Sequence, residues 1–166
     1  RSRAHCARPK MIPLFLDMDG VLCTARSALA FGRGHWKHLD PVACRLLGRL
    51  FKKEPNLRVV LSSTWRTHFD RHAMDHILCN GGIDSIPWHD DWRTKDLNVR
   101  LSGYVPRGKE IAEWLERNGK PEKYLILDDD NDMLEEQKPF FIRTHELDGI
   151  STQNYIDACK ILKAEP

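Results

Sequence analysis

The sequence runs IPLFLDMDG from Ile12 to Gly20, and this stretch decides the fold, because a short apolar run ends abruptly in acidic residues and a glycine. The apolar part has the length and character of a buried β-strand. One residue separates Asp17 from Asp19, so both carboxylates point the same way if the extended geometry continues, and together they can bind a hard cation. Gly20 allows the tight exit that such a loop needs. Aspartate and glycine also terminate strands for turn geometry alone, and for one such cluster both interpretations stay open.

The same arrangement recurs twice along the chain. The apolar run Leu57 to Leu61 ends in Ser62-Ser63-Thr64, and the run Tyr124 to Leu127 ends in a series of acidic residues and one asparagine, 128–132. Turn chemistry alone can account for one polar cluster at the end of a strand, but it is a much weaker explanation for polar clusters after three strands. The remaining elements that the pattern predicts are a short strand at 83–86, a last strand at 140–142, and helices at about 41–51, 67–79, 108–117 and 151–163.

This alternation predicts an α/β fold, a three-layer Rossmann-like parallel sheet with helices on both faces. In such folds ligands bind at the carboxyl ends of the strands. The three polar clusters therefore converge on one edge of the sheet.

Length and composition indicate one soluble domain. The chain has 166 residues, 41% hydrophobic and 30% charged, which is ordinary for a globular protein. No apolar run has the roughly 18 residues of a membrane span, so we expect no membrane partner. The five cysteines are odd in number and scattered. They argue against a disulfide framework or a thiolate zinc site, and we expect a reducing, cytoplasmic location.

Net charge gives no evidence for a partner. It is +2 overall, but Arg1, Arg3, Arg8 and Lys10 contribute four positive charges, so the remaining 22 basic and 24 acidic residues leave −2. We interpret residues 1–10 as a basic tail or a leftover upstream segment, and residues 11–166 as a single domain. The sequence leaves the oligomeric state open.

The motifs resemble those of haloacid dehalogenase-like (HAD) phosphatases. The run 14–22 is similar to that family's first motif, a hydrophobic strand followed by D-x-D-G, and 59–62 is similar to the second, a strand ending in Ser or Thr. Arg107 or Lys109 resembles the basic third motif, and 125–129 resembles the acidic fourth. The four occur in the family's order and span most of the chain.

The resemblance implies a Mg²⁺-dependent phosphomonoesterase. Asp17 would be the nucleophile that forms an aspartyl-phosphate, and Asp19 the general acid and base. Mg²⁺ would be bound by Asp17, Asp128 and Asp129, and Asp19 is the fourth residue expected at the metal. Ser62 would donate a hydrogen bond to the phosphate. Arg107, which we favour over Lys109, would offset charge in the transition state.

A finer resemblance concerns the substrate. Gly32-Arg33-Gly34 is similar to a segment in the phosphatase domain of polynucleotide kinase phosphatases, and the run 61–66 resembles the HAD domain of multidomain RNA repair proteins. It implies that Arg33, Ser63 and Arg66 bind the substrate, a phosphorylated nucleic-acid end or a nucleotide. For Arg33, an ordinary solvated loop arginine remains the alternative.

Two further features bear on function. The segments 21–57 and 67–106 leave no room for a cap domain, and an open site favours a phosphate on a macromolecule. Trp36, Trp88 and Trp92 could stack on bases. Tryptophan side chains more often pack in the protein interior. Gly103 to Lys109 fits G-x-x-x-x-G-K, but Glu110 replaces the hydroxyl residue of a phosphate-binding loop, which argues against a kinase. A catalytically idle HAD module that binds nucleic acid or protein is the alternative to the enzyme.

Overall fold

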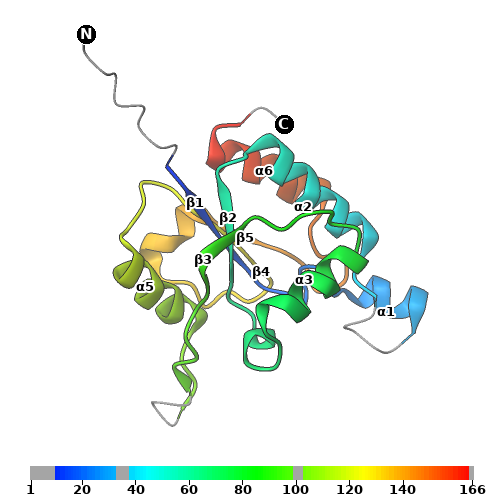
Figure 1. Ribbon diagram of the computed structural model, residues 1–166, viewed down its shortest axis with the longest axis horizontal. Coiled ribbons are helices and arrows are strands. Elements are labelled where there is room, and N and C mark those ends of the chain that lie inside the picture. Colours follow the sequence, from blue (N-terminus) through cyan, green and yellow to red (C-terminus); the bar gives the residue numbers. More distant parts are fainter. Residues whose placement is uncertain (1–9, 33–37, 99–102, 165–166) are drawn as a thin grey trace.

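The fold is a parallel sheet between two layers of helices (Figure 1). It is seen in a computed structural model that describes residues 10–32, 38–98 and 103–164. Five strands form the sheet in the order β3-β2-β1-β4-β5, and every pairing is parallel. The strands are β1 (Ile12–Leu16), β2 (Leu57–Leu61), β3 (Trp88–Arg93), β4 (Leu125–Asp128) and β5 (Phe141–Arg143). The α/β, Rossmann-like architecture expected from the sequence is therefore confirmed.

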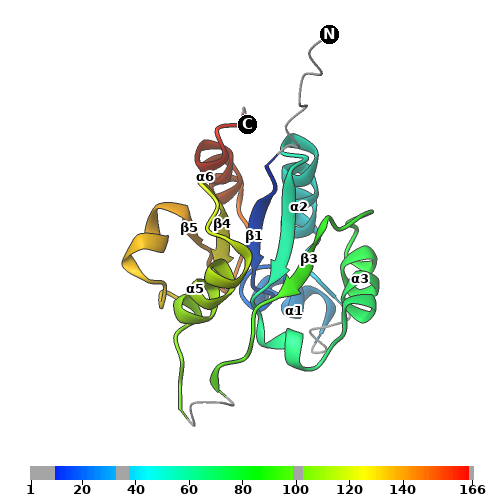
Figure 2. The ribbon, with the colours of Figure 1, turned by 60° about the vertical axis from the view of Figure 1, so that its left-hand side comes forward.

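Alternate residues of the strands face the two helical layers. Leu14 and Leu16 of β1 belong to the larger core cluster, together with buried side chains of α2 (Pro41–Lys53), α3 (Arg71–Asn80) and α6 (Thr152–Leu162). Phe15, between them, points to the opposite face and packs edge-on against Trp114 of α5 (Arg107–Asn118). In Figure 2, α5 lies on one side of the sheet and α2 and α3 lie on the other. β1 is thus buried on both faces and fixes the position of the acidic loop that follows it.

Side-chain caps set where the helices begin. Asp40 is buried, and its carboxylate accepts hydrogen bonds from the amides of Val42 and Ala43 at the start of α2. The same carboxylate binds Thr24, the N-cap of the short helix α1 (Ala25–Phe31), and the guanidinium of Arg26. Asp40 therefore joins the loop after β1 to α2.

The third strand lies later in the chain than the sequence indicates. The expected strand at 83–86 is wrong, and the edge strand β3 is instead Trp88–Arg93. This segment reads Trp-His-Asp-Asp-Trp-Arg, and its polar residues do not match the apolar run by which the other strands are recognised. As an edge strand it pairs with β2 alone, so its side chains stay partly exposed.

Two other differences concern the helices. Residues Thr64–Thr67 form a 3₁₀ turn, and α3 begins only at Arg71, whereas the sequence predicts a helix from about residue 67. The helix α1 and the 3₁₀ helix Glu135–Phe140 are not anticipated from the sequence.

The segments between the strands hold single helices and loops rather than a second domain. Within the described residues, no cap covers the carboxyl edge of the sheet. In that same part of the chain no helix is long and apolar enough to cross a membrane. Arg33 and Trp36, for which the sequence suggests contacts with substrate, lie outside the described residues, as do residues 1–9 of the basic tail.

Candidate active site

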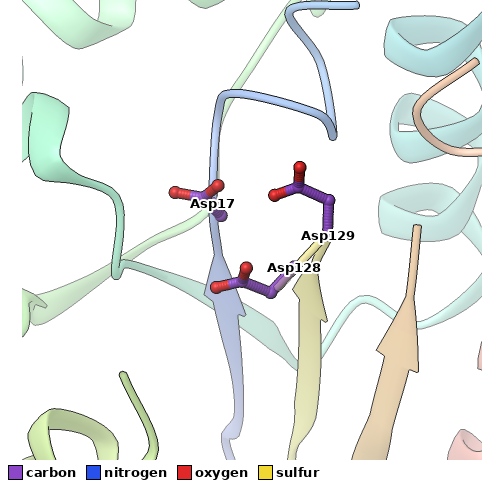
Figure 3. A group of neighbouring side chains, drawn as sticks. All are labelled: Asp17, Asp128 and Asp129. Atoms are coloured by element: carbon purple, nitrogen blue, oxygen red, sulfur yellow. The ribbon is translucent and has the colours of Figure 1, made fainter. Parts of the chain in front are cut away.

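Three aspartates meet at the carboxyl ends of β1 and β4. Asp17 follows β1. Asp128 is the last residue of β4, which pairs directly with β1, and Asp129 comes immediately after it. One carboxylate oxygen from each lies within 4.8 Å of the other two. Figure 3 shows the three side chains together at the ends of the two strands. We call these three residues the acidic corner.

Burial makes the acidic corner costly to ionise. Asp17 is 6% exposed and Asp128 1%, and Oδ2 of Asp128 has no hydrogen-bond partner among the described residues. Burial raises the pKa of Asp17 to about 6, although Arg107 and a hydrogen bond from Ser63 act in the opposite direction. Burial and the neighbouring Asp17 raise the pKa of Asp128 to about 8, and burial also raises that of Asp129. Closely spaced carboxylates, one with a buried oxygen that accepts no hydrogen bond from the described residues, are suited to a hard divalent cation such as Mg²⁺.

Gly20 allows the loop after β1 to close against the acidic corner. Its φ of 67° lies in the left-handed region, and a Cβ at this position would lie 2.2 Å from Oδ2 of Asp129. The loop is held by the carbonyl of Met18, which accepts hydrogen bonds from the amides of Leu22 and Cys23. Glycine is therefore required both for backbone geometry and for space.

Asp19 lies outside the acidic corner. Its side chain is exposed, and its Oδ2 accepts a hydrogen bond of 2.9 Å from Nε1 of Trp65. The carboxylates grouped closely enough to share an ion are those of Asp17, Asp128 and Asp129, so the structure does not bring the Asp19 carboxylate into the group expected from the sequence. An exposed carboxylate held by an indole next to the corner is placed to exchange protons with a ligand. Trp65, which orients it, was not foreseen.

The two serines after β2 have different surroundings. Ser62 continues the sheet through its amide, which donates to the carbonyl of Leu16, and its Oγ is buried without a hydrogen-bond partner in the described part of the chain. Ser63 instead hydrogen-bonds the Asp17 carboxylate, which lowers the pKa of that group against the effect of burial. The sequence favours Ser62 as the functional hydroxyl, whereas the contact with Asp17 belongs to Ser63.

Of the two basic candidates at the start of α5, Arg107 faces the acidic corner. Its Nε lies 3.6 Å from Oδ2 of Asp128, and its charge lowers the pKa of Asp17. Lys109 is exposed, and no ion pair is found for it among the described residues. The geometry thus agrees with the preference for Arg107.

Arg66 does not have the environment expected of a substrate-binding residue. It is 3% exposed, and its guanidinium donates to the carbonyls of residues 62, 63, 94 and 95 and to Glu110. These bonds occupy all of the N–H groups that arginine has. In this structure Arg66 ties the loops after β2 and β3 to α5, an arrangement that favours a structural role over the predicted contact with a phosphate.

Comparison with known families agrees with this arrangement. A family model described as the HAD domain in Swiss Army Knife RNA repair proteins matches residues 13–155. The chain belongs to this family. The searches of curated proteins and of solved structures found no match.

In this HAD domain Glu110 is the centre of a buried ionic network. It is 1% exposed, and its Oε2 accepts hydrogen bonds from Arg66 at 2.7 Å and from Arg107 at 3.0 Å. Its Oε1 accepts from the amide of Leu97 at 3.1 Å. Glu110 therefore connects Arg107, and through it the acidic corner, to the loops after β2 and β3. Its spacing of three from Arg107 on one helix is visible in the sequence, but its burial is not.

Breaking this network should destabilise the fold. Glu110→Gln removes the charge that pairs with the buried guanidinium of Arg66 and with the half-buried one of Arg107. We expect a loss of about 3–5 kcal/mol in the free energy of unfolding. Denaturant unfolding measures the loss. The matched control is Glu116→Gln, an exposed glutamate on the same helix. Equal free energies of unfolding for the two variants would show that the ion pairs of Glu110 do not stabilise the fold.

The raised pKa values of the acidic corner lead to a second prediction, which concerns how the stability of the fold depends on pH. Without divalent cations, in the presence of a metal chelator, only the protons of the carboxyl groups matter. Asp17 and Asp128 keep their protons to a higher pH in the folded chain than in the unfolded chain, where the usual value is 3.8. Their contribution to stability is therefore complete below pH 3.8 and is lost as the pH rises, until both are ionised above about pH 8. Mg²⁺ binds the ionised carboxylates, so the stabilisation by millimolar Mg²⁺ should grow over the same interval.

Thermal unfolding with EDTA and with Mg²⁺ across this pH range tests this second prediction. Asp129→Ala should reduce the difference between the two conditions, while Asp84→Asn, an exposed aspartate before β3, should keep it. A Mg²⁺ effect that is absent, or that does not change with pH, contradicts the assignment of the corner as a cation site.

Proposed function

We propose that this HAD domain is a Mg²⁺-dependent phosphomonoesterase that removes a terminal phosphate from nucleic acid or a nucleotide through an aspartyl-phosphate on Asp17. The observation that carries the proposal is the acidic corner with Arg107 against it and Asp19 beside it. The printed description of the family, which concerns RNA repair proteins, supports a nucleic-acid end as the substrate.

In the first step, a carboxylate oxygen of Asp17 attacks phosphorus and the ester bond to the leaving oxygen breaks. Asp19 gives its proton to that oxygen, so the alcohol leaves neutral. Arg107 and the hydroxyl of Ser63 or Ser62 stabilise the charge on the phosphoryl oxygens. The hydrogen bond from Trp65 keeps the Asp19 carboxylate oriented during the transfer.

In the second step, water attacks the phosphorus of the aspartyl-phosphate. Asp19, now ionised, takes a proton from the water, and the bond between phosphorus and the Asp17 oxygen breaks to release inorganic phosphate. A cation bound by Asp17, Asp128 and Asp129 would screen the repulsion between carboxylate and phosphate.

The alternative is a catalytically idle module that binds nucleic acid or protein. A binding module has no need for buried carboxylates that repel one another, whereas a nucleophile and a cation site require them. The open carboxyl edge, without a cap in the described residues, suits the end of a large substrate. Trp88 and Trp92 pack against the core and each other, which favours packing over base stacking for both.

The described cysteines also support the reducing, cytoplasmic location that we propose. No disulfide is found among Cys23, Cys44, Cys79 and Cys159, the cysteines that lie in the described ranges. Disulfides are rare in proteins of reducing compartments.

A panel of 3′- and 5′-phosphorylated RNA and DNA oligonucleotides, nucleotides and phosphopeptides, assayed for phosphate release, tests the proposal. Release should require Mg²⁺. Asp17→Asn should abolish it, because the amide keeps the shape and loses the nucleophile. Asp19→Asn should slow it by about 10²–10⁴ through the loss of proton transfer.

The matched control for both variants is Asp84→Asn, remote from the acidic corner along the chain and outside its group. Turnover of Asp17→Asn at the wild-type rate excludes the mechanism. Metal-dependent binding of oligonucleotides without release of phosphate favours the idle module.

A further inference from the structure

A cavity of about 470 Å³ lies beside the acidic corner. It is bounded by the loop after β2 on one side and by the segment before α5 on the other. Its lining includes Thr64, His68, Asn98, Tyr104, Arg107 and Asp130. Its volume is typical of pockets that hold a small organic ligand, which occupy about 300–1,000 Å³. Because Arg107 borders both the cavity and Asp128, a group bound here lies next to a phosphate at the corner.

Tyr104 presents a flat aromatic surface at this cavity. Its side chain is 76% exposed, which is unusual for so large an apolar ring. Its hydroxyl donates a hydrogen bond to Oδ2 of Asp132, and the same oxygen accepts from the amide of Arg107 at 2.7 Å. Asn98 holds the next residue by accepting a hydrogen bond from the amide of Val105 at 2.7 Å. The ring is thus fixed relative to Arg107 although it faces solvent.

The charges around the cavity indicate what it can accept. Asp96, Asp130 and Asp132 line it, while the two arginines that reach it are engaged, Arg66 by five internal acceptors and Arg107 by Glu110 and Asp128. Such a lining repels a second phosphate group inside the cavity. It suits an uncharged group with hydroxyl and amine donors and a flat ring.

We propose that this cavity binds the nucleoside that carries the scissile phosphate, with its base stacked on Tyr104 and its hydrogen-bond donors facing the carboxylates. The proposal rests on the phosphatase function proposed above and assigns its substrate selectivity. Stacking on an aromatic ring is tolerant of base identity, since every base has a π-face. The site therefore distinguishes nucleotides from other phosphomonoesters rather than one base from another.

The test compares a nucleotide with a phosphomonoester that has no base. For wild type, Tyr104→Ala and Tyr104→Phe, we would measure kcat/KM on the adenosine monophosphate, 3′ or 5′, that the wild type hydrolyses faster, and on glycerol phosphate. Tyr104→Ala should lower the ratio of the two constants by about tenfold, the effect of losing one base stack. Tyr104→Phe keeps the ring and loses the hydrogen bond to Asp132, so it should retain most of the ratio.

Binding separates this inference from the proposed function. In the Asp17→Asn background with Mg²⁺, equilibrium dialysis with the same two ligands should show the same dependence on Tyr104. Base-selective binding that needs Tyr104, without any phosphate release by the wild type, supports the cavity and contradicts the phosphatase. Phosphate release with an unchanged ratio in Tyr104→Ala, or equal binding losses for both ligands, overturns the nucleoside site and leaves the phosphatase standing.

Discussion

The central constraint of this structure is the close approach of two buried carboxylates, those of Asp17 and Asp128, which repel each other when both are ionised. The pairing of β1 with β4 places them at adjacent strand ends, and burial removes the water that would screen them. Their pKa values are raised because burial, and for Asp128 the neighbouring Asp17, disfavours the ionised forms. A fold retains such a cost when a ligand relieves it, and a divalent cation with a phosphate is the ligand whose charges match. The position of Gly20 against Asp129 shows how little spare room the corner has.

A chain of ion pairs connects the acidic corner to the loops after β2 and β3. Arg107 lies next to Asp128 and is held from behind by Glu110, which is itself matched by Arg66. Arg66 in turn binds the backbone of the loops after β2 and β3. The position of the Arg107 guanidinium is therefore linked to both loops through Glu110 and Arg66. The Asp132 carboxylate accepts hydrogen bonds from both the amide of Arg107, at the start of α5, and the hydroxyl of Tyr104. The residue that stabilises charge at the corner and the ring of the proposed nucleoside site are therefore held by the same side chain.

Strong local patterns made much of this predictable. The run before Asp17 is apolar on both faces of a central strand, and the order of four motifs indicated the family and the acidic corner. The sequence could not show that Arg66 and Glu110 neutralise each other, because they are 44 residues apart and meet only through the fold. Nor could it distinguish Ser62 from Ser63, since the direction of each side chain depends on where β2 ends. The edge strand β3 was missed because a strand paired on one side tolerates Asp and His.

The most direct test of the central claim is to trap the covalent intermediate on Asp17. A phosphate-labelled oligonucleotide that the protein hydrolyses would be mixed with excess protein and Mg²⁺, quenched in acid within one turnover, and the protein mapped by peptide mass spectrometry. The account predicts a transient phosphoryl group on Asp17 that appears before free phosphate and then decays. Release of phosphate at the full rate with Asp17 never labelled, or with the label on another residue, would contradict it.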